Sequence, residues 1–435
     1  MERAYGRSRV RLSKAILRVF DGSFLGNTIR RLKALGEVHI LTTKSMEALT
    51  HRAVKQENLD PRNVLFEPMG KNTAPAVALL CHILNLRGQG EEIVGVFPSD
   101  HLIADEAIFQ RAVKLAEQTA KQGFVTTLGV LPSYPATGYG YIEVGSESLA
   151  REKDLKALQV KGFREKPNQA TAKQYVDSGN YFWNAGMFVF RVSEMIGHFQ
   201  KFQPAIWDKI SQIDAEMKNA RYNYAMVDGT SLDYGIMERL EAQACVPCDM
   251  GWSDVGSWDE MARLLDENAP LQSHSRAQVF NQNSENNYVF SVGSKVVGLV
   301  DVTDMLIVDT PDALLIARKG SSQKVKELVD AMKMANQPEA TSHPFETRPW
   351  GGFEILADEK NHKTKRVTID PGAQLSYQSH ARRSEHWVVI SGKGEVILNE
   401  KKISLSPGES IHIPVGAKHR MRNPGDTPLI FVEVQ

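Results

Sequence analysis

The sequence is poor in cysteine, in long apolar runs and in net charge. Its three cysteines in 435 residues cannot form a disulfide framework, and with no signal-peptide pattern they predict a reducing, cytoplasmic location. The longest apolar run, residues 74–84, is interrupted by His82 and is too short to span a bilayer, so it predicts a buried helix. The 52 basic residues balance the 52 acidic ones. Overall charge therefore indicates neither nucleic acid nor a membrane as a partner.

What the chain has instead is an alternation of short β-branched segments and amphipathic segments. Segments 38–43 and 124–130 are typical of buried strands, and segments 46–57 and 105–122 have apolar residues at helical spacing. This order predicts an α/β fold for the first part of the chain. The length leaves room for two or three domains.

Two aspartates follow predicted strand ends. The segment VGVFPSDH is a β-branched and aromatic run that breaks at Pro98 and is followed by Asp100, and a second carboxylate, Asp254, lies in the segment WSDVGSW. Ligands of open α/β sheets collect at the carboxyl ends of strands, and carboxylates there can hold a divalent cation against phosphate oxygens. The two aspartates can share one Mg²⁺. The alternative is that Asp100 only caps a turn or the next helix.

A turn rich in proline and glycine precedes the apolar run. In the segment FEPMGKNTAPA, either Asn72 or Thr73 can cap the incoming helix. The free amides of a helix N-terminus suit an anion or the edge of a base. An ordinary capped helix explains this stretch equally well.

Three later segments combine glycines, aromatic rings and charges. In PATGYGYI, Gly138 permits close approach of the backbone to a ligand, while the ring of Tyr139 supplies a wall. In FREKP, Glu165 and Lys166 form a pair suited to a sugar hydroxyl and a phosphate, or to a solvated salt bridge. Asn184 is predicted to lie in a small-residue turn before a strand.

Taken in order, seven motifs resemble those of the mannose-1-phosphate guanylyltransferases among the sugar nucleotidyltransferases. They are FEPMGKNTAP, VFPSDH, PATGYGYI, FREKP, FWNAGMF, SLDYGIMER and GWSDVGSW. Seven ordered motifs are more specific than any single one. The resemblance implies a Rossmann-like α/β domain of the GT-A type that transfers GMP from GTP to mannose-1-phosphate, giving GDP-mannose and pyrophosphate.

The same resemblance implies a role for each candidate residue. It implies Mg²⁺ at Asp100 and Asp254, guanine near Asn72 and Thr73, mannose beside Gly138, Glu165 and Asn184, and the mannose phosphate at Lys166.

Beyond residue 267 the pattern changes to short strands separated by polar turns and followed by one helix. Segment 337–347 contains two prolines and no periodicity, which is typical of a linker. We therefore expect a transferase domain over 1–267, a β-rich connector over 268–340 and a final domain over 341–435.

The final segment carries ligand-type side chains at regular spacing. Its pattern is Gly372-x5-Gln378-x-His380-x4-Glu385-x6-Gly392, followed by Gly408-x5-Pro414-x-Gly416-x2-His419-x3-Asn423. This resembles the two cupin motifs, with glutamine in place of the first histidine. On adjacent strands of a small jelly-roll barrel, Gln378, His380, Glu385 and His419 can converge on one divalent metal such as Zn²⁺, Co²⁺ or Mn²⁺. The alternative is that both motifs match by accident.

The segments RSEHW and IPVGAKHR further resemble the mannose-6-phosphate isomerase half of bifunctional enzymes. The resemblance implies interconversion of fructose-6-phosphate and mannose-6-phosphate through an enediol, which needs a Lewis acid and a base. His386 is the candidate base, with Arg383 and Arg420 as phosphate ligands. The alternative is that His386 is a barrel residue packed beside Trp387. The sequence leaves open whether the chain forms a homo-oligomer.

The first residues depart from the transferase pattern. The family opens with G-G-x-G-T-R and then P-K-Q-F, whereas residues 1–13 contain one glycine, Gly6, and only SKAI echoes the second part, with Lys14 at the position of the family lysine. A loop that cradles phosphates needs clustered amide donors on glycine backbones. We therefore expect weak or absent guanylyl transfer. This leaves open an isomerase with a scaffold transferase half, or a sugar-binding regulator without turnover.

Overall fold

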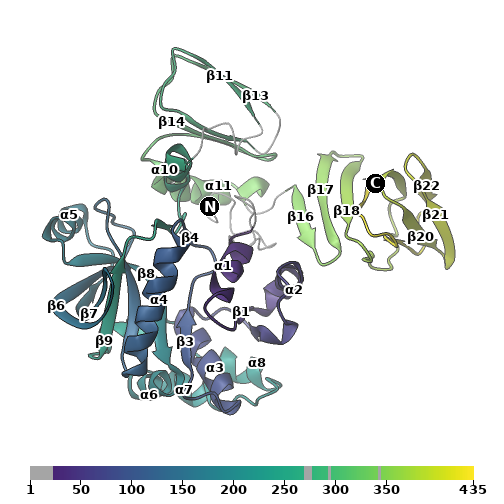
Figure 1. Cartoon of the computed structure of the whole chain (residues 1–435). Coiled ribbons are helices and arrows are strands. Elements are labelled where there is room, and N and C mark those ends of the chain that lie inside the picture. The colour runs from purple at the N-terminus through teal and green to yellow at the C-terminus, as the bar shows by residue number, and fades with distance from the viewer. Residues whose placement is uncertain (1–22, 269–276, 292–294, 341–343) are drawn as a thin grey trace. The chain divides into compact units, whose positions relative to one another are not determined.

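A computed structural model of the chain describes residues 23–268, 277–291, 295–340 and 344–435 (Figure 1). The candidate Lys14 lies outside these residues. The described residues form two compact units that divide between Gly256 and Ser257. The sequence pattern predicts a domain boundary later, at 267. α10 (Trp258–Asn268) lies in the second unit, where the carboxylate of Asp259 accepts hydrogen bonds from the backbone of the connector.

The first unit is built on a mixed six-stranded sheet with the order β3-β8-β5-β9-β7-β6. These strands are β3 (Ile93–Val96), β5 (Val125–Val130), β6 (Tyr141–Glu152), β7 (Leu155–Arg164), β8 (Tyr181–Arg191) and β9 (Gln243–Cys248). β5 and β9 pair in parallel, and the other neighbouring pairs are antiparallel. Two small sheets accompany it: β1 (Ile40–Thr43) with β2 (Val64–Glu67), and β4 (Leu102–Ile103) with β10 (Trp252–Ser253).

Helices cover both faces of this sheet. On β8, Phe188 and Phe190 lie in one core cluster, and Met187 and Val189 lie in another, as strand alternation requires. The first cluster contains residues of α3 (Thr73–Leu86), α6 (Val192–Phe202), α7 (Pro204–Ile210), α8 (Ala220–Ala225) and α9 (Leu232–Gly235). The second contains residues of α4 (Glu106–Lys121). The predicted α/β fold is confirmed, and the predicted buried helix over 74–84 lies within α3.

The other helices of the first unit are α1 (Phe24–Lys33), α2 (Glu47–Gln56) and α5 (Gln169–Ser178), with 3₁₀ turns η2 (Lys44–Met46), η3 (Pro61–Asn63) and η4 (Met237–Arg239). One local prediction is wrong. Asn184 lies inside the long strand β8 rather than in a turn before it. The small residues around it instead produce a register shift against β5, with Gly186 at a φ of +65°.

The connector in the second unit contains parallel strand pairs with a constant offset. Gln278 pairs with Val296, Tyr288 with Leu306, and Glu285 with Thr303, each 18 residues apart. A fixed offset between parallel segments is typical of a solenoid coil. The elements of the connector are β11 (Gln278–Gln282), β12 (Tyr288–Ser291), β13 (Val296–Val300), β14 (Met305–Asp309), β15 (Leu314–Arg318), η5 (Ser322–Lys324), α11 (Val325–Met334) and η6 (Pro338–Ala340). The sequence predicted the short strands but not the coil.

The C-terminal segment folds as two antiparallel sheets with the strand orders β16-β17-β18-β24-β19-β22 and β21-β20-β23. The strands are β16 (Phe345–Arg348), β17 (Gly351–Asp358), β18 (Lys363–Ile369), β19 (Glu385–Ser391), β20 (Gly394–Leu398), β21 (Lys401–Leu405), β22 (Ser410–Ile413), β23 (His419–Arg422) and β24 (Leu429–Val434). Residues of both sheets share one apolar core, which includes Trp387, Val396 and Phe431. This confirms the predicted cupin barrel.

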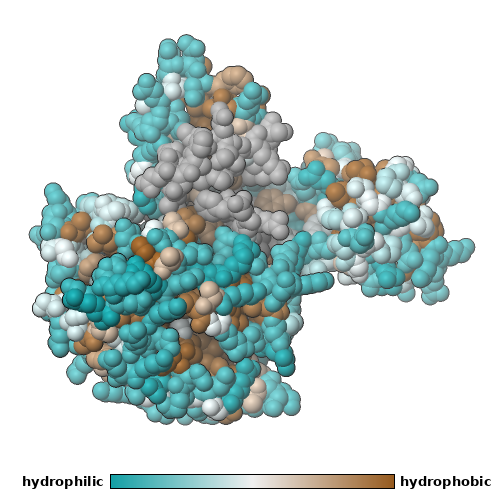
Figure 2. Space-filling view, viewed as in Figure 1, coloured by the Kyte–Doolittle hydropathy of each residue, from teal (hydrophilic) through white to brown (hydrophobic). Residues whose placement is uncertain are grey.

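Among the described residues, no helix is long and apolar enough to cross a membrane. On the face that Figure 2 shows, the surface is mostly hydrophilic, with scattered apolar residues. The cysteines Cys81, Cys245 and Cys248 are free and buried.

Candidate functional site

The segments that carry Asp100 and Asp254 meet in space although 154 positions separate them. β4 and β10 pair with Ser253 opposite Leu102, so that Asp100, which precedes β4, and Asp254, which follows β10, come to the same end of the pair. The indole nitrogen of Trp252 also donates to Nδ1 of His101 at 3.1 Å, which holds the two segments together. This arrangement fits the predicted pair of oxygen donors, which are the ligands that Mg²⁺ prefers.

Asp254 is oriented by two hydrogen bonds to its Oδ1. The hydroxyl of Tyr139 donates to it at 2.9 Å, and the amide of Gly256 does so at the same distance. Burial, together with the charge of Asp254, raises the pKa of Tyr139, so this phenol stays protonated and donating at neutral pH. Its ring meets those of Trp183 and Trp252 edge to face, at 5.1 and 5.4 Å between centroids. The predicted aromatic wall therefore stands beside Asp254.

Glu165 and Asn184 both lie close to Gly140. A Cβ at Gly140 would lie 2.6 Å from Oε2 of Glu165 and 3.6 Å from Cβ of Asn184, so a side chain there would displace the carboxylate. The amide of Asn184 donates to the carbonyl of Gly140 at 2.9 Å. Gly138 is exposed, and nothing lies within 4 Å of the Cβ position there. Gly140, rather than Gly138, is thus the glycine whose missing side chain makes room for Glu165.

Lys166 lies beside Glu165, and most of its side chain is exposed to solvent. Its Nζ lies 2.8 Å from Oε1 of Glu165, and 62% of its side chain is exposed. An exposed ammonium beside a carboxylate suits the predicted phosphate contact.

Sequence reasoning missed Asp233, which is a partner of Asn184. The side-chain amide of Asn184 donates to Oδ1 of Asp233 at 2.7 Å. Burial raises the pKa of Asp233, while the bond from Asn184 opposes this shift. The motif SLDYGIMER carries the residue, but the motif alone does not indicate what Asp233 touches.

The start of α3 docks on the segment that precedes Asp233. Asn72 caps α3 with its side chain, which accepts from the amide of Thr73 at 2.8 Å. The hydroxyl of Thr73 accepts from the amide of Leu232 at 2.8 Å. Asn72 has φ +73° and ψ −175°, a region used almost only by glycine, where other residues cost about 1–3 kcal/mol. Strain of this kind is typical of functional sites, and here it lies in the loop predicted to meet the base.

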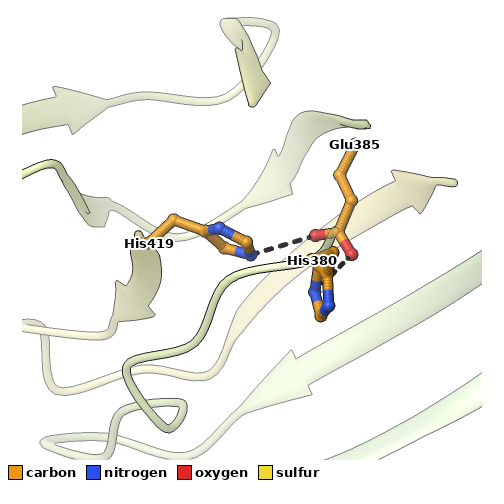
Figure 3. A group of neighbouring side chains, drawn as sticks. All are labelled: His380, Glu385 and His419. Atoms are coloured by element: carbon orange, nitrogen blue, oxygen red, sulfur yellow. Dashed lines mark ion pairs between the residues drawn. The ribbon is translucent and has the colours of Figure 1, made fainter. Parts of the chain in front are cut away.

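The cupin barrel brings together three of its four predicted metal ligands. Ligand atoms of His380, Glu385 and His419 all lie within 4.8 Å of one another. Figure 3 shows the carboxylate of Glu385 pointing toward both imidazoles. Its Oε1 lies 3.0 Å from Nε2 of His380, and its Oε2 lies 3.3 Å from Nε2 of His419. Glu385 and His419 are almost fully buried.

Two hydrogen bonds orient the imidazole rings of the cluster. Nδ1 of His419 lies 2.9 Å from the carbonyl of Ala417, so it must donate, and the neutral ring then has its lone pair on Nε2, toward Glu385. Nε2 is buried, and it faces the carboxylate of Glu385 at 3.3 Å. Nε2 of His380 accepts from Nη2 of Arg383 at 3.0 Å and also faces Glu385. With both rings neutral, two imidazole lone pairs and a carboxylate face one another, and this donor set fits a divalent metal.

The titratable side chains of the cluster shift one another's pKa. Burial alone would raise the pKa of Glu385, but His419, Arg383 and His380 together hold it below its usual value. Burial lowers the pKa of His380, whereas the carboxylate of Glu385 keeps that of His419 raised despite burial.

The fourth predicted ligand, Gln378, is brought next to His419 by the backbone. The backbone amide of each residue donates a hydrogen bond to the carbonyl of the other, at 3.0 and 2.8 Å, and Gln378 is exposed. Arg383 also belongs to the cluster, because its Nε donates to Oε1 of Glu385 at 3.0 Å.

The other two predicted isomerase residues do not reach the cluster. His386 is exposed and follows Glu385 on β19, so it lies on the opposite face of that strand, where its ring stacks 6.5 Å from that of His412. Arg420 follows His419 on β23 in the same way, and its guanidinium lies over the ring of Tyr377 at 5.6 Å. Strand alternation was the signal in the sequence: a residue next to an inward ligand faces outward.

Both the first unit and the cupin barrel match known protein families. The chain matches the nucleotidyl transferase family over residues 8–269, the MannoseP isomerase/GMP-like beta-helix domain over 281–332 and the mannose-6-phosphate isomerase C-terminal family over 335–435. It is similar to the xanthan biosynthesis protein XanB of Xanthomonas campestris pv. campestris (strain B100), with 38% identity over 88% of this chain and 81% of that protein.

Two further relatives cover most of the chain. A mannose-1-phosphate guanylyltransferase of Salmonella muenchen is 36% identical over all of this chain and 92% of its own. A crystal structure described as mannose-1-phosphate geranyltransferase from Thermus thermophilus has a TM-score of 0.65 and 28% identity, over 76% of this chain and 96% of that one. The chain belongs to the family in which a mannose-1-phosphate guanylyltransferase is joined to a mannose-6-phosphate isomerase C-terminal domain.

Proposed function

We propose that this chain makes GDP-mannose from GTP and mannose-1-phosphate with its first unit, and interconverts fructose-6-phosphate and mannose-6-phosphate with its cupin barrel. The observation that carries the proposal is the presence of two polar clusters of different chemistry in one chain of this family. One combines strand-end carboxylates with sugar-binding groups. The other combines imidazoles and a carboxylate in a barrel.

In the first unit, Asp100 and Asp254 would hold Mg²⁺, which when bound neutralises charge on the phosphates. Lys166 binds the phosphate of mannose-1-phosphate, one oxygen of which attacks the α-phosphorus of GTP while the bond to pyrophosphate breaks. Glu165 accepts hydrogen bonds from mannose hydroxyls, and Asn184, held by Asp233, orients the sugar.

At the other end of the nucleotide, Asn72 and Thr73 meet the guanine edge. The cap bond and the bond from Leu232 fix both side chains before substrate arrives. Gly138 and Tyr139 complete the sugar side of this site.

In the barrel, His380, Glu385 and His419, with Gln378 as a fourth ligand, would hold Zn²⁺, Co²⁺ or Mn²⁺, which when bound acts as a Lewis acid toward the carbonyl oxygen. Arg383 binds negative charge on the substrate next to this group.

With these two activities, the chain would divide into a transferase domain over 1–267, a connector over 268–340 and a cupin domain over 341–435. A cytoplasmic location agrees with three free thiols, since such thiols persist in a reducing compartment.

The test is to assay both half-reactions with the purified full-length chain. Pyrophosphate release from GTP is measured with mannose-1-phosphate, and conversion of fructose-6-phosphate is measured by coupling mannose-6-phosphate to a reporter enzyme. Each assay is repeated after treatment with a chelator, which should abolish both activities. Isomerisation without transfer would reduce the first unit to a scaffold, and the absence of both activities would make the chain a binding protein.

A further inference from the structure

Three neighbouring strands of the barrel present apolar side chains inward along most of their length and charged ones at one end. The apolar inward residues form one core: Val367 and Ile369 on β18, Leu429 and Phe431 on β24, and Trp387 and Val389 on β19. By the two-residue period of strands, the next inward positions are Lys365, Glu433 and Glu385. Since Glu385 belongs to the candidate metal cluster, the other two face the same end of the lumen.

Glu433 lies at the centre of this charged end. It is 5% exposed, and its Oε1 lies 3.3 Å from Nζ of Lys365, its direct cross-strand partner. The side-chain amide of Gln435 donates to Glu433 and also lies 3.5 Å from Oε1 of Glu385. A short chain of polar contacts thus joins Glu433 to the ligand cluster.

A buried carboxylate here needs an explanation, because the remaining inward positions of these strands are apolar. Removing a charge from water costs several kcal/mol, and an apolar side chain would pack at this position without that cost. Burial raises the pKa of Glu433, and Lys365 opposes this shift. A carboxylate beside an ammonium in the lumen can pass a proton to and from a bound substrate.

We propose that Glu433 carries the proton between C1 and C2 of the hexose 6-phosphate and that Lys365 carries the hydroxyl proton between O2 and O1. This inference rests on the isomerase activity proposed above. It replaces His386 as the base, because His386 faces the opposite side of β19.

The proton transfers balance without a further reactant. From the open-chain ketose, the Glu433 carboxylate takes one proton from C1, the C1–H electron pair becomes the C1=C2 bond, and the carbonyl pair moves to O2, which takes a proton from Lys365. The enediol then gives its O1 proton to Lys365, C1=O forms, and the C1=C2 pair takes the proton from Glu433 at C2. Both side chains return to their starting states.

The experiment compares full-length Glu433→Gln and Lys365→Met with the wild type, all loaded with Co²⁺. The matched control is Glu354→Gln, which alters an exposed cross-strand pair with Arg366 in the same barrel. The readouts are kcat and KM for fructose-6-phosphate, Co²⁺ content and its visible spectrum, and exchange of the C1 hydrogen of fructose-6-phosphate in deuterated water.

Glu433→Gln should lower kcat by about 10²–10⁴-fold, the usual contribution of a general base. Its KM should stay within about threefold of the wild-type value, with an unchanged Co²⁺ spectrum, and C1 exchange should fall with turnover. Lys365→Met should lose turnover but keep more of the C1 exchange, because the carbon proton still has its base. The control should match the wild type.

Two results would overturn the inference. One is a Glu433→Gln variant that turns over within threefold of the wild type. The other is a variant that has lost its Co²⁺ or its spectrum, which would make Glu433 a structural support of the cluster. A wild-type chain that binds Co²⁺ but does not isomerise would instead refute the proposed function.

Discussion

The two candidate sites are assembled over very different distances along the chain. In the barrel, the three clustered ligands lie between His380 and His419, on two strands and the loop before one of them. In the first unit, the candidate residues extend from Asn72 to Asp254 and come from helix starts, strand ends and a bulged strand. A short segment can therefore carry a complete constellation in its spacing, whereas a site spread over a domain depends on how the whole sheet is packed.

The two sites also differ in how strongly their members depend on one another. In the barrel, the carboxylate of Glu385 lies 3.0–3.3 Å from two imidazole nitrogens, and one bound metal would hold all three side chains. In the first unit, the members are tied by ordinary donor–acceptor pairs, such as Tyr139 to Asp254 and Asn184 to Asp233. Removal of one member should therefore be most severe in the barrel and graded in the first unit.

The largest effect is expected for His419→Ala. Loss of one of three clustered ligands should remove the bound metal and with it several kcal/mol of stabilisation, which is about 10³-fold or more in isomerase rate. Metal content and isomerase rate are measured together, with His412→Ala as the control, because His412 is exposed. A variant that keeps turnover without metal would contradict the ligand assignment. Guanylyl transfer should not change.

The next effect is expected for Asp254→Ala. Without this carboxylate the first unit loses a proposed Mg²⁺ ligand and the acceptor for Tyr139, so transfer should fall by about 10²–10³-fold while isomerisation is unchanged. The control Asp249→Ala removes an exposed carboxylate five positions earlier. Full transfer activity in Asp254→Ala would refute the role.

A graded effect is expected for Asp233→Ala. The hydrogen bond from Asn184 to this half-buried carboxylate is worth about 1.5–3 kcal/mol and holds Asn184 in place, so kcat/KM for mannose-1-phosphate should fall by about 10- to 100-fold, with KM for GTP little changed. Asp228→Ala, an exposed position of the same segment, is the control. Equal losses for both substrates would point to general damage rather than to sugar positioning.

Replacement of the first residues by a G-G-x-G-T-R loop tests the expectation drawn from residues 1–13. The added amide donors should raise guanylyl transfer by at least about tenfold through better orientation of the triphosphate. Transfer is measured against an insert of the same length with alanine in place of glycine. Robust transfer by the unaltered chain, with no gain from the graft, would show that Lys14 and its neighbours suffice.

The smallest effect is expected for His386→Ala. Because its ring lies outside the barrel against His412, isomerase kcat should change by less than about threefold and metal content should be unchanged. A loss of more than tenfold with metal retained would restore His386 as the base and contradict the role given to Glu433.

Local patterns in the sequence were enough to predict several parts of the structure. Helices α3 and α4 and the strands of the connector depend on spacing within a few residues, and the structure contains them. The cupin barrel was predicted from the resemblance to two motifs, and the structure contains it as well. The spacing of the two motifs that resemble those of cupins also predicted the group of His380, Glu385 and His419, which the structure brings together. Alternation also excludes His386 and Arg420 from that group, although the motif resemblance alone does not.

Other features were decided only by tertiary structure. The contact of Asn184 with Asp233, the room that Gly140 leaves for Glu165, and the inward ion pair of Lys365 with Glu433 join residues far apart in the sequence. Such contacts depend on which strands become neighbours and in which register, and on the packing of helices against them. No local period encodes these choices, since the free energy that selects them comes from burying distant apolar segments together.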